Sequence, residues 1–395
     1  MTHLAGVDAP PVRNGPGPRR LGALAAPVRH AAPALLGFAA VRLLCAVVLA
    51  LWDPAEEKGV VRLLSRRWDS VWYASIAENG YERTVRLEDG GVHSDLAFFP
   101  LLPWLERGIG AVSPLSAGEA GLLVSAVASL AAAWGLFAIG DRLYGRRAGV
   151  LLAVLWAAVP VGIVQSMAYT ESLFTAFAAW SLYALLTGRW LWAGALSAAA
   201  GLTRPAGLAV AAAVAVTAAV TLLSDRDVPW SAHRRMLLGV LLAPLGWLGY
   251  VVWVAGRTGE PLGYLDIQEQ WGNGFDGGRA FASFVLDRLT GSAPLAGVGL
   301  IAGVALLIWV CVLCVRLRLP VPLLVYGAAM VVLALCAAGY FGSKPRLLLP
   351  AFPLLLPAAV ALARARRGTV ALVVGGAVAG AAVYGAIWLT GSGPP

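Results

Sequence analysis

The segment from residue 67 to residue 73 places one carboxylate between aromatic and basic side chains. Its sequence is Arg67-Trp68-Asp69-Ser70-Val71-Trp72-Tyr73. A carboxylate such as Asp69 can act as a general base that takes a proton from an attacking hydroxyl. Asp also caps helix N-termini, and the apolar spacing after it predicts an amphipathic helix. The two roles are compatible, and the residue types alone favour neither.

Two cations form the second candidate group. Lys344 and Arg346 lie in a short segment between two apolar runs, Gly342-Ser343-Lys344-Pro345-Arg346. Cations near a helix start suit the phosphate of a lipid-linked substrate. Ordinary anchoring at the membrane surface would use the same residues, so both interpretations stay open.

Glu171 and Arg204 are charges at the edges of apolar runs. A charge in such a place is costly unless it is paired or faces a polar cavity. We expect both side chains to face the same cavity, where they either pair with each other or bind a ligand. In the second case Arg204 would add to the phosphate contacts and Glu171 would contact the sugar or acceptor.

Further candidates for binding a sugar or an acceptor are Trp68 and Trp72, which flank Asp69, and three residues in the long loops. Asp95 could orient an acceptor, although a solvated loop charge is the simpler interpretation. Gln268 and Trp271 suit a sugar, because an indole ring stacks on it and an amide hydrogen-bonds its hydroxyls. Trp271 could equally anchor the chain at the membrane interface.

Two of the cysteines, Cys311 and Cys314, have the CxxC spacing that in a soluble protein could indicate metal or redox chemistry. All four cysteines fall inside apolar runs, where we expect them to pack as small side chains: Cys45, Cys311, Cys314 and Cys336. Among the acids and the histidine of the first loop, no ligand spacing supports a metal site. We expect no required cofactor, while the sequence leaves a divalent metal open.

The composition indicates the scaffold that must hold these residues. Of the 395 residues, 59% are hydrophobic and 13% are charged, whereas a soluble domain carries about a quarter charged residues. We therefore predict an all-α polytopic membrane protein with about 11 transmembrane helices. Residues 1–32 are predicted to be a disordered cytoplasmic tail and residues 33–395 a single transmembrane domain. The expected helices cover 33–52, 118–140, 149–167, 170–187, 190–203, 205–223, 237–256, 292–315, 321–341, 347–363 and 369–390.

The distribution of charge predicts an orientation. The net charge of +9 is spread over short basic clusters between apolar runs, which argues against nucleic-acid binding. Basic residues before the first helix place the N-terminus in the cytoplasm, and almost all acids then fall outside. Two long extracytoplasmic loops follow, at 53–117 and 257–291. The first is predicted to hold interfacial or re-entrant elements at 71–80 and 96–105.

Several motifs resemble, in the same order, those of the PIG-V family of membrane mannosyltransferases (GPI mannosyltransferase 2). Beyond the segment around Asp69 they are Ile76-Ala77-Glu78-Asn79-Gly80-Tyr81, Ala97-Phe98-Phe99-Pro100-Leu101-Leu102-Pro103, Tyr169-Thr170-Glu171-Ser172-Leu173-Phe174, Thr203-Arg204-Pro205-Ala206-Gly207 and Gln268-Glu269-Gln270-Trp271-Gly272. Together they extend over most of the chain. The alanine-rich and arginine-rich composition indicates a bacterial member, of actinobacterial type.

The resemblance implies the GT-C fold of membrane glycosyltransferases, which use polyprenyl-phosphate sugars on the non-cytoplasmic face. It implies that Asp69 is the catalytic base of an inverting transfer. Mannose would move from polyprenyl-phosphate mannose to an extracytoplasmic hydroxyl of a glycolipid or cell-envelope glycan at the cell membrane. A flippase or transporter of lipid-linked sugars and a non-catalytic subunit of a glycosylation complex are the alternatives. The sequence identifies neither the acceptor nor the oligomeric state.

Overall fold

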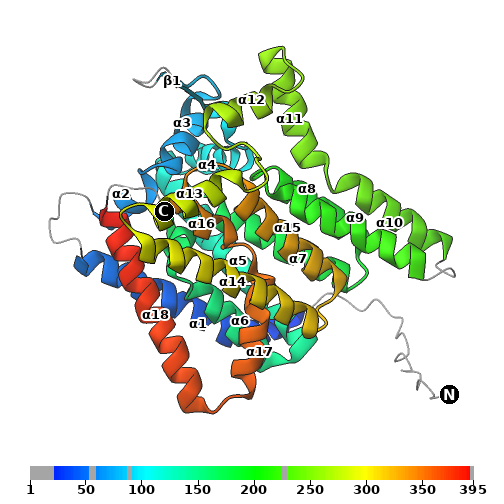
Figure 1. Ribbon diagram of the computed structural model, residues 1–395. Helices are drawn as coiled ribbons and strands as arrows, with labels where there is room; N and C mark the ends of the chain where they lie inside the picture. The colour runs from blue at the N-terminus through cyan, green and yellow to red at the C-terminus, as the bar shows by residue number, and fades with distance from the viewer. Residues whose placement is uncertain (1–21, 53–58, 87–90, 225–228, 392–395) are drawn as a thin grey trace.

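The long apolar runs of the sequence form helices that pack into one bundle (Figure 1). The computed structural model describes residues 22–52, 59–86, 91–224 and 229–391. Within these residues, six helical spans are long and apolar enough to cross a membrane. They lie in α1 (Gly22–Trp52), α5 (Ala117–Tyr144), α9 (Gly207–Ser224), the consecutive α10 (Trp230–Leu242) and α11 (Leu245–Thr258), α14 (Pro294–Arg316) and α18 (Arg367–Thr390).

Two further apolar segments are sharply bent. The first, bent by 86°, joins α6 (Arg146–Ala157) to the 3₁₀ helix η2 (Pro160–Ser166). The second, bent by 73°, has four pieces: η3 (Phe341–Ser343), α16 (Lys344–Leu348), η4 (Phe352–Leu355) and α17 (Leu356–Arg364). Prolines lie at both breaks, and proline removes a helical hydrogen bond. With each bent pair counted as one span, up to eight segments qualify.

The protein is therefore a multi-pass membrane protein with six to eight candidate spans by length and composition. The predicted count of about eleven spans is not shown by the described residues, in which some expected spans are broken and others are short. The short ones are α7 (Glu171–Leu186), α8 (Trp190–Gly201) and α15 (Val321–Cys336), with 16, 12 and 16 residues.

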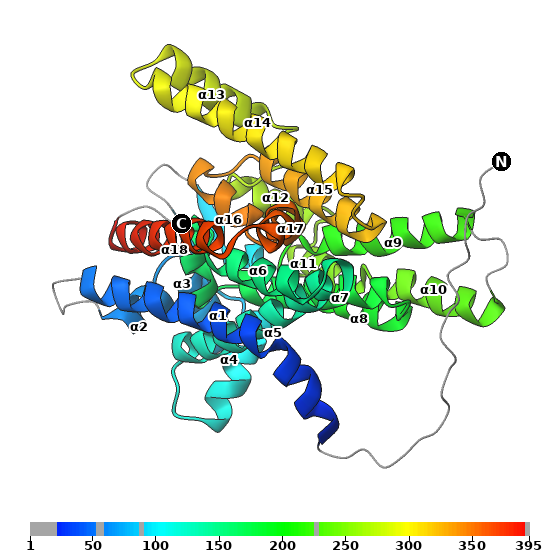
Figure 2. The ribbon, with the colours of Figure 1, turned by 90° about the horizontal axis from the view of Figure 1, so that it is seen from below.

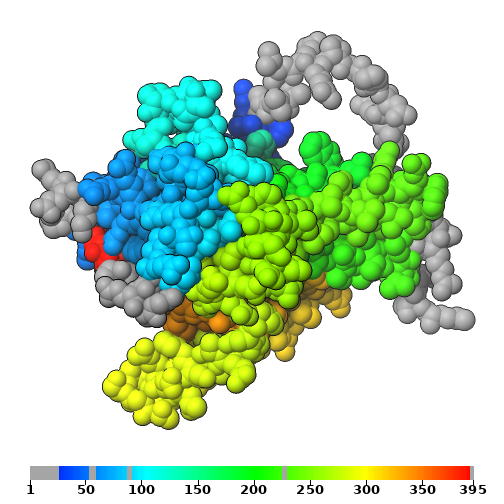
Figure 3. Space-filling model, turned by 90° about the horizontal axis from the view of Figure 1, so that it is seen from above, coloured from blue at the N-terminus to red at the C-terminus, as the bar shows by residue number. Residues whose placement is uncertain are grey.

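The first predicted loop contains the helices that we expected and a hairpin that we did not. Its elements are α2 (Val60–Ser65), α3 (Asp69–Asn79), β1 (Thr84–Arg86), β2 (Val92–Ser94), η1 (Asp95–Ala97) and α4 (Leu101–Val112). The two strands pair antiparallel, with Val85 opposite His93. The second loop contains α12 (Gly263–Gln270) and α13 (Arg279–Thr290). Figure 3 shows the first loop, in blue and cyan, beside α12 in yellow-green.

The first helix begins earlier than the hydropathy predicts. Helix α1 starts at Gly22, so residues 22–32, which lie within the predicted tail, are helical. Pro27 and Pro33 lie inside this helix. The rest of the predicted tail, residues 1–21, lies outside the described residues.

Glycines allow the helices of the bundle to approach closely. Gly140 of α5 lies against Gly149 of α6, and Gly194 of α8 lies against Gly239 of α10, with no room for a Cβ in either place. Small residues at such contacts are typical of helix packing in membranes, where backbones gain dispersion contacts by approaching each other. By contrast, α13 and α14 form a helical hairpin that projects from one side of the bundle (Figure 2).

Glu106 of α4 is an acid that the fold buries without a partner. It is fully buried, and neither carboxylate oxygen has a hydrogen-bond partner among the described residues. The carboxyl lies against Gly121 of α5, where any larger residue would collide with it. Burial raises the pKa of Glu106 to about 9, and the charge of Glu78 acts in the same direction. The carboxyl is therefore protonated at neutral pH.

Glu106→Gln should weaken the pH dependence of stability. The folded-state pKa of about 9 exceeds the ordinary value of 4.5, so the bound proton stabilises the fold at low pH. This contribution is lost as the pH rises from about 5 to about 9, by up to about 1.4 kcal/mol per pH unit. Gln keeps the shape but does not titrate. The Tm in detergent should thus fall less with pH in the variant than in the wild type.

The exposed Glu78 offers a matched control. In Glu78→Gln, Glu106 still titrates, so the Tm should depend on pH nearly as in the wild type. The charge of Glu78 is the smaller of the two causes that raise the pKa of Glu106. Identical slopes for all three proteins would contradict a buried, neutral Glu106.

Candidate active site

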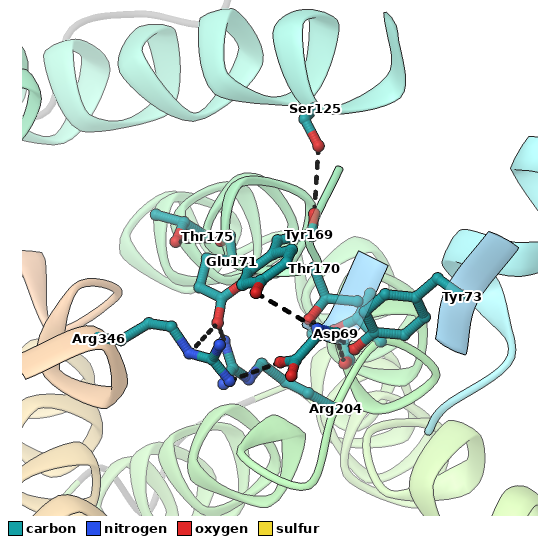
Figure 4. A network of polar contacts seen from close by, with 11 residues as sticks. Asp69, Tyr73, Ser125, Tyr169, Thr170, Glu171, Thr175, Arg204 and Arg346 are labelled. Atoms are coloured by element: carbon teal, nitrogen blue, oxygen red, sulfur yellow. Dashed lines mark hydrogen bonds and ion pairs between the residues drawn. The ribbon is translucent and has the colours of Figure 1, made fainter. Parts of the chain in front are cut away.

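Four charged side chains from distant parts of the chain meet in one ion-pair network (Figure 4). Arg346 lies at its centre. One of its terminal nitrogens donates to Asp69 Oδ2 at 2.6 Å, and its Nε lies 3.1 Å from Glu171 Oε1. Arg204 approaches the same Glu171 oxygen at 2.9 Å. The two positive and two negative charges balance, as buried ionic groups require.

Each member of this network lies where a helix starts or breaks. Asp69 is the first residue of α3 and Glu171 the first of α7. Arg204 lies in the break between α8 and α9, and Arg346 lies in the five-residue helix α16. Carboxylates in a first helical turn are favoured by the free amides there. The helix boundaries therefore both place the charges and stabilise the two acids.

The network is buried except at Asp69. The side chain of Glu171 is 2% exposed, those of Arg204 and Arg346 are 10% and 12% exposed, and that of Asp69 is 26% exposed. Asp69 is thus the member that a substrate outside the bundle reaches most easily. Glu171 and Arg204 pair with each other, which is one of the two arrangements that the sequence leaves open.

Asp69 is not the helix cap that the sequence allowed. Trp68 occupies the N-cap position of α3, and no side chain caps the helix. Trp68 has a φ of 52°, a left-handed conformation that costs free energy in a bulky residue. The Arg67 guanidinium lies 4.2 Å from the centroid of the Trp68 ring. Because its carboxylate is not used for capping, Asp69 can face Arg346.

Arg67 connects this loop to the end of the last helix. Its guanidinium donates hydrogen bonds to the carbonyl of Leu389 and, at 2.8 Å, to the carbonyl of Gly391. Carbonyls at the end of a helix lack helical partners and carry partial negative charge. The segment that precedes Asp69 is therefore held to the end of α18.

Two tyrosines complete the surroundings of Asp69. The Asp69 amide donates to the Tyr169 hydroxyl at 3.3 Å, and the Arg346 guanidinium lies 5.0 Å from the Tyr169 ring centroid. Tyr73, one turn after Asp69, lies with its hydroxyl 3.3 Å from Thr170 Oγ1. We had assigned no role to either tyrosine. The signals were their spacings, two residues before Glu171 and four after Asp69.

An aromatic cluster lies beside the network and joins the two long loops. We use this name for Trp72, Tyr73, His93, Phe98 and Trp271. The Trp72 ring stacks on Phe98 at 5.6 Å and meets Trp271 edge-on at 5.0 Å, while His93 stacks on Trp271 at 4.0 Å. Tyr73 meets Phe98 edge-on at 5.2 Å. Because Tyr73 also contacts Thr170, the cluster is continuous with the ion-pair network.

Gln268 and Asp95 are engaged by the backbone of the first loop. The Gln268 amide donates to the carbonyl of Ala97 at 3.1 Å. Asp95 is buried and accepts a hydrogen bond from the Arg83 amide at 2.8 Å, beside the hairpin. Burial raises the pKa of Asp95, while backbone hydrogen bonds act in the opposite direction. Asp95 is thus neither a solvated loop charge nor a member of the network.

Lys344 does not join Arg346 in the network. Its ammonium is buried and donates to the carbonyls of Ala334 and Ala337, at 3.1 and 2.7 Å. These carbonyls lie at the end of α15, where helical acceptors lack partners and cations are favoured. The phosphate role that we predicted for Lys344 gains no support from this position.

No group of three or more Cys, His, Asp or Glu side chains with the geometry of a metal site occurs within residues 22–52, 59–86, 91–224 and 229–391. The Cys314 thiol packs inside the bundle near the carbonyl of Pro353, at 3.6 Å. An open cavity of about 410 Å³ lies beside α2, between Arg62, Arg66 and Glu119. This cavity lies near the loop that carries Asp69.

Comparison of the fold with solved structures gives a similar arrangement in ArnT from Cupriavidus metallidurans. The form bound to undecaprenyl phosphate has a TM-score of 0.50 and 20% identity, with 82% of this chain and 60% of that chain covered. The apo form has a TM-score of 0.50 and 19% identity, with 84% of this chain and 60% of that chain covered. This chain has the GT-C fold. It spans about three fifths of the length of ArnT, covering 60% of that chain.

A weaker similarity in fold relates the chain to an archaeal oligosaccharyltransferase. The apo oligosaccharyltransferase of Archaeoglobus fulgidus has a TM-score of 0.49 and 15% identity, with 91% of this chain and 56% of that chain covered. No curated protein matches the sequence of the chain.

A family match supports the same class of protein. Residues 97–253 match the family described as dolichyl-phosphate-mannose-protein mannosyltransferase. The family match and the GT-C fold agree with the predicted class of membrane glycosyltransferase. The matched segment contains Glu171 and Arg204, whereas Asp69 and Arg346 lie on either side of it.

Glu171→Gln should destabilise the GT-C bundle strongly. The substitution keeps the shape but leaves two buried guanidinium groups beside a neutral amide. Removing one partner of a buried ion pair costs about 3–5 kcal/mol. We expect a lower Tm in detergent, and partial recovery when Arg204→Met is added, because the second change removes the uncompensated charge.

Glu269→Gln, at an exposed position of α12, serves as the control and should leave the Tm unchanged. If Glu171→Gln were as stable as this control, the network would contribute little to the fold.

Proposed function

We propose that the protein is an inverting mannosyltransferase that uses a polyprenyl-phosphate mannose donor. The observation that carries the proposal is the Arg346 guanidinium, which contacts the partly exposed Asp69 at 2.6 Å. A phosphate ligand and a catalytic carboxylate would thus share one cation. The motif order of the PIG-V family and the family match at residues 97–253 support mannose as the sugar.

The proposed reaction is a single displacement. The oxygen of an acceptor hydroxyl attacks the anomeric carbon of the mannosyl phosphate, while the bond from that carbon to the phosphate oxygen breaks. The hydroxyl proton passes to Asp69, and the electron pair of the broken bond stays with the polyprenyl phosphate. Since phosphate is a competent leaving group, one carboxylate is sufficient, unlike in glycosidases that need a second carboxyl as acid.

Arg346 links donor binding to the freedom of the base. A donor phosphate beside Arg346 would compete with Asp69 for the same guanidinium, because Arg binds phosphate in a two-pronged geometry. Asp69 would then leave the ion pair and accept the proton of the acceptor. Glu171 would keep Arg346 in position during this exchange, since it pairs with Arg346 on one side and with Arg204 on the other.

The aromatic cluster is the proposed sugar and acceptor site. Trp72 lies one helical turn from Asp69 on the same side of α3, and Trp271 packs against it. Indole faces bind the apolar faces of sugar rings. Trp68 would border the site from the other side of Asp69, and Gln268 would hydrogen-bond sugar hydroxyls.

We further propose that this site faces the extracytoplasmic side, with the N-terminus in the cytoplasm. The basic clusters between the apolar runs and the acids of the two long loops support this orientation. The acceptor would then be a glycolipid or a cell-envelope glycan. The undecaprenyl phosphate in the ArnT structure is the type of lipid expected as the donor carrier.

Asp69→Asn should abolish sugar transfer without unfolding the protein. The amide keeps the shape of the side chain but cannot take the proton, so the rate should fall about 10²- to 10⁴-fold. Transfer from radiolabelled polyprenyl-phosphate mannose by purified protein measures this. Asp266→Asn, an exposed position on α12, should retain full transfer. Wild-type turnover by the Asp69 variant would refute the base, and sugar transport without transfer by the wild type would favour a flippase.

The shared cation predicts a second effect of the same variant. In Asp69→Asn the Arg346 guanidinium no longer pairs with a carboxylate on that side, so a polyprenyl phosphate should bind more tightly than to the wild type. The Arg346→Gln variant should bind the polyprenyl phosphate at least about tenfold more weakly than the wild type, because a charge-assisted pair is lost. Arg279→Gln, an exposed position on α13, is the control. Unchanged binding in both site variants would remove Arg346 from the donor site.

A further inference from the structure

The end of the bundle remote from Asp69 carries a second polar feature, a cavity of about 400 Å³ lined by basic residues. We call it the basic cavity. Its lining comprises Tyr144, Gly145, Arg146, Arg147, Ala148, Val360, Ala363 and Arg364. The three arginines are exposed at its rim, whereas Ala148 and Val360 are buried and form an apolar floor.

The cavity is about one membrane thickness from the ion-pair network. Ser125 of α5 donates to the Tyr169 carbonyl at 3.2 Å and marks the level of the network on that helix. Tyr144 lies 19 residues further along the same helix, a distance of about 28 Å at 1.5 Å per residue. A hydrocarbon core is about 30 Å thick. In Figure 1, α3 lies near the top and α17 towards the bottom.

Several candidate spans end at the basic cavity. The span Ala117–Tyr144 ends there, one bent pair begins at Arg146, and the other ends at Arg364. The last span begins close by, at Arg367. The cavity therefore lies where apolar helix surface gives way to water, which is the depth of lipid headgroups.

Within the described residues, no carboxylate pairs with the arginines of the basic cavity, Arg146, Arg147 and Arg364. The nearby acid Asp141 pairs with His30 instead, at 2.8 Å. Arg147 donates to the carbonyl of Ala365 at 2.9 Å, which holds the side chain at the rim beside Arg364.

We propose that the basic cavity binds the headgroup of an anionic glycerophospholipid in the leaflet opposite the one that faces Asp69. Three guanidinium groups supply the donors that a phosphate diester needs, and basic pockets between transmembrane helices are suited to such headgroups. The buried alanine and valine side chains of the floor contact the glycerol backbone. This site is separate from sugar transfer and does not depend on the proposed reaction.

Native mass spectrometry of the full protein in detergent, titrated with cardiolipin, tests the proposal. The variant with Arg147→Gln and Arg364→Gln removes two of the three guanidinium groups. The control, with Arg234→Gln and Arg235→Gln, removes the same charge at exposed positions of α10, near the start of another candidate span. We expect the affinity for cardiolipin to fall at least about tenfold in the first variant and to equal that of the wild type in the control.

Further arms distinguish the sources of phosphate. Phosphatidylcholine should not compete with cardiolipin at the cavity, and glycerol 3-phosphate alone should bind much more weakly than the lipid. If the cavity variant is not monodisperse, Ala363→Glu, which adds a negative charge to the lining, should reduce cardiolipin binding in the same way. Equal binding by cavity variant and control, or competition by glycerol 3-phosphate at the concentration of the lipid, would overturn the proposal.

Discussion

The site depends on one guanidinium group that serves two carboxylates. Arg346 contacts Asp69 at 2.6 Å and Glu171 at 3.1 Å, and Arg204 balances the remaining charge. None of these groups would be tolerated alone in apolar surroundings, because an unpaired buried charge costs several kcal/mol. The first loop, α7, the break after α8 and the bent segment around α16 must therefore come together for the bundle to form. Assembly of the site and of the fold is one event.

The sequence predicted the class of fold well because hydropathy acts over long runs. The membrane class and the extra helical elements of the first loop could be predicted from residue type and position, whereas Glu171 and Arg204 could be expected to lie together without a choice between pairing and ligand binding. The number of spans could not be predicted in this way, because the runs 149–167 and 347–363 are mostly apolar and hydropathy does not register a bend. The hairpin of two three-residue strands and the early start of α1 at Gly22 are likewise not predicted by hydropathy.

The site was predictable in its charges but not in their partners. Lys344 and Arg346 are two residues apart and looked equivalent, yet one binds carbonyls of α15 and the other binds carboxylates. Which way each side chain points depends on the bent backbone around them, and sequence spacing does not reveal it. The same limit applies to Asp95, whose burial follows from the hairpin. Tyr169 belongs to one of the sequence motifs, but its contact with Asp69 forms only in the folded bundle.

The contact of Arg67 with the end of α18 has a consequence for biogenesis. Membrane helices are inserted in the order in which they are synthesised, and the loop with Asp69 emerges early. Its neighbour Arg67 has its acceptors, the carbonyls of Leu389 and Gly391, more than 300 positions later. During most of translation the strained turn at Trp68 thus lacks this support. The nascent chain would therefore complete the surroundings of Asp69 only when its final helix has docked, and the proposed sugar transfer could begin only then.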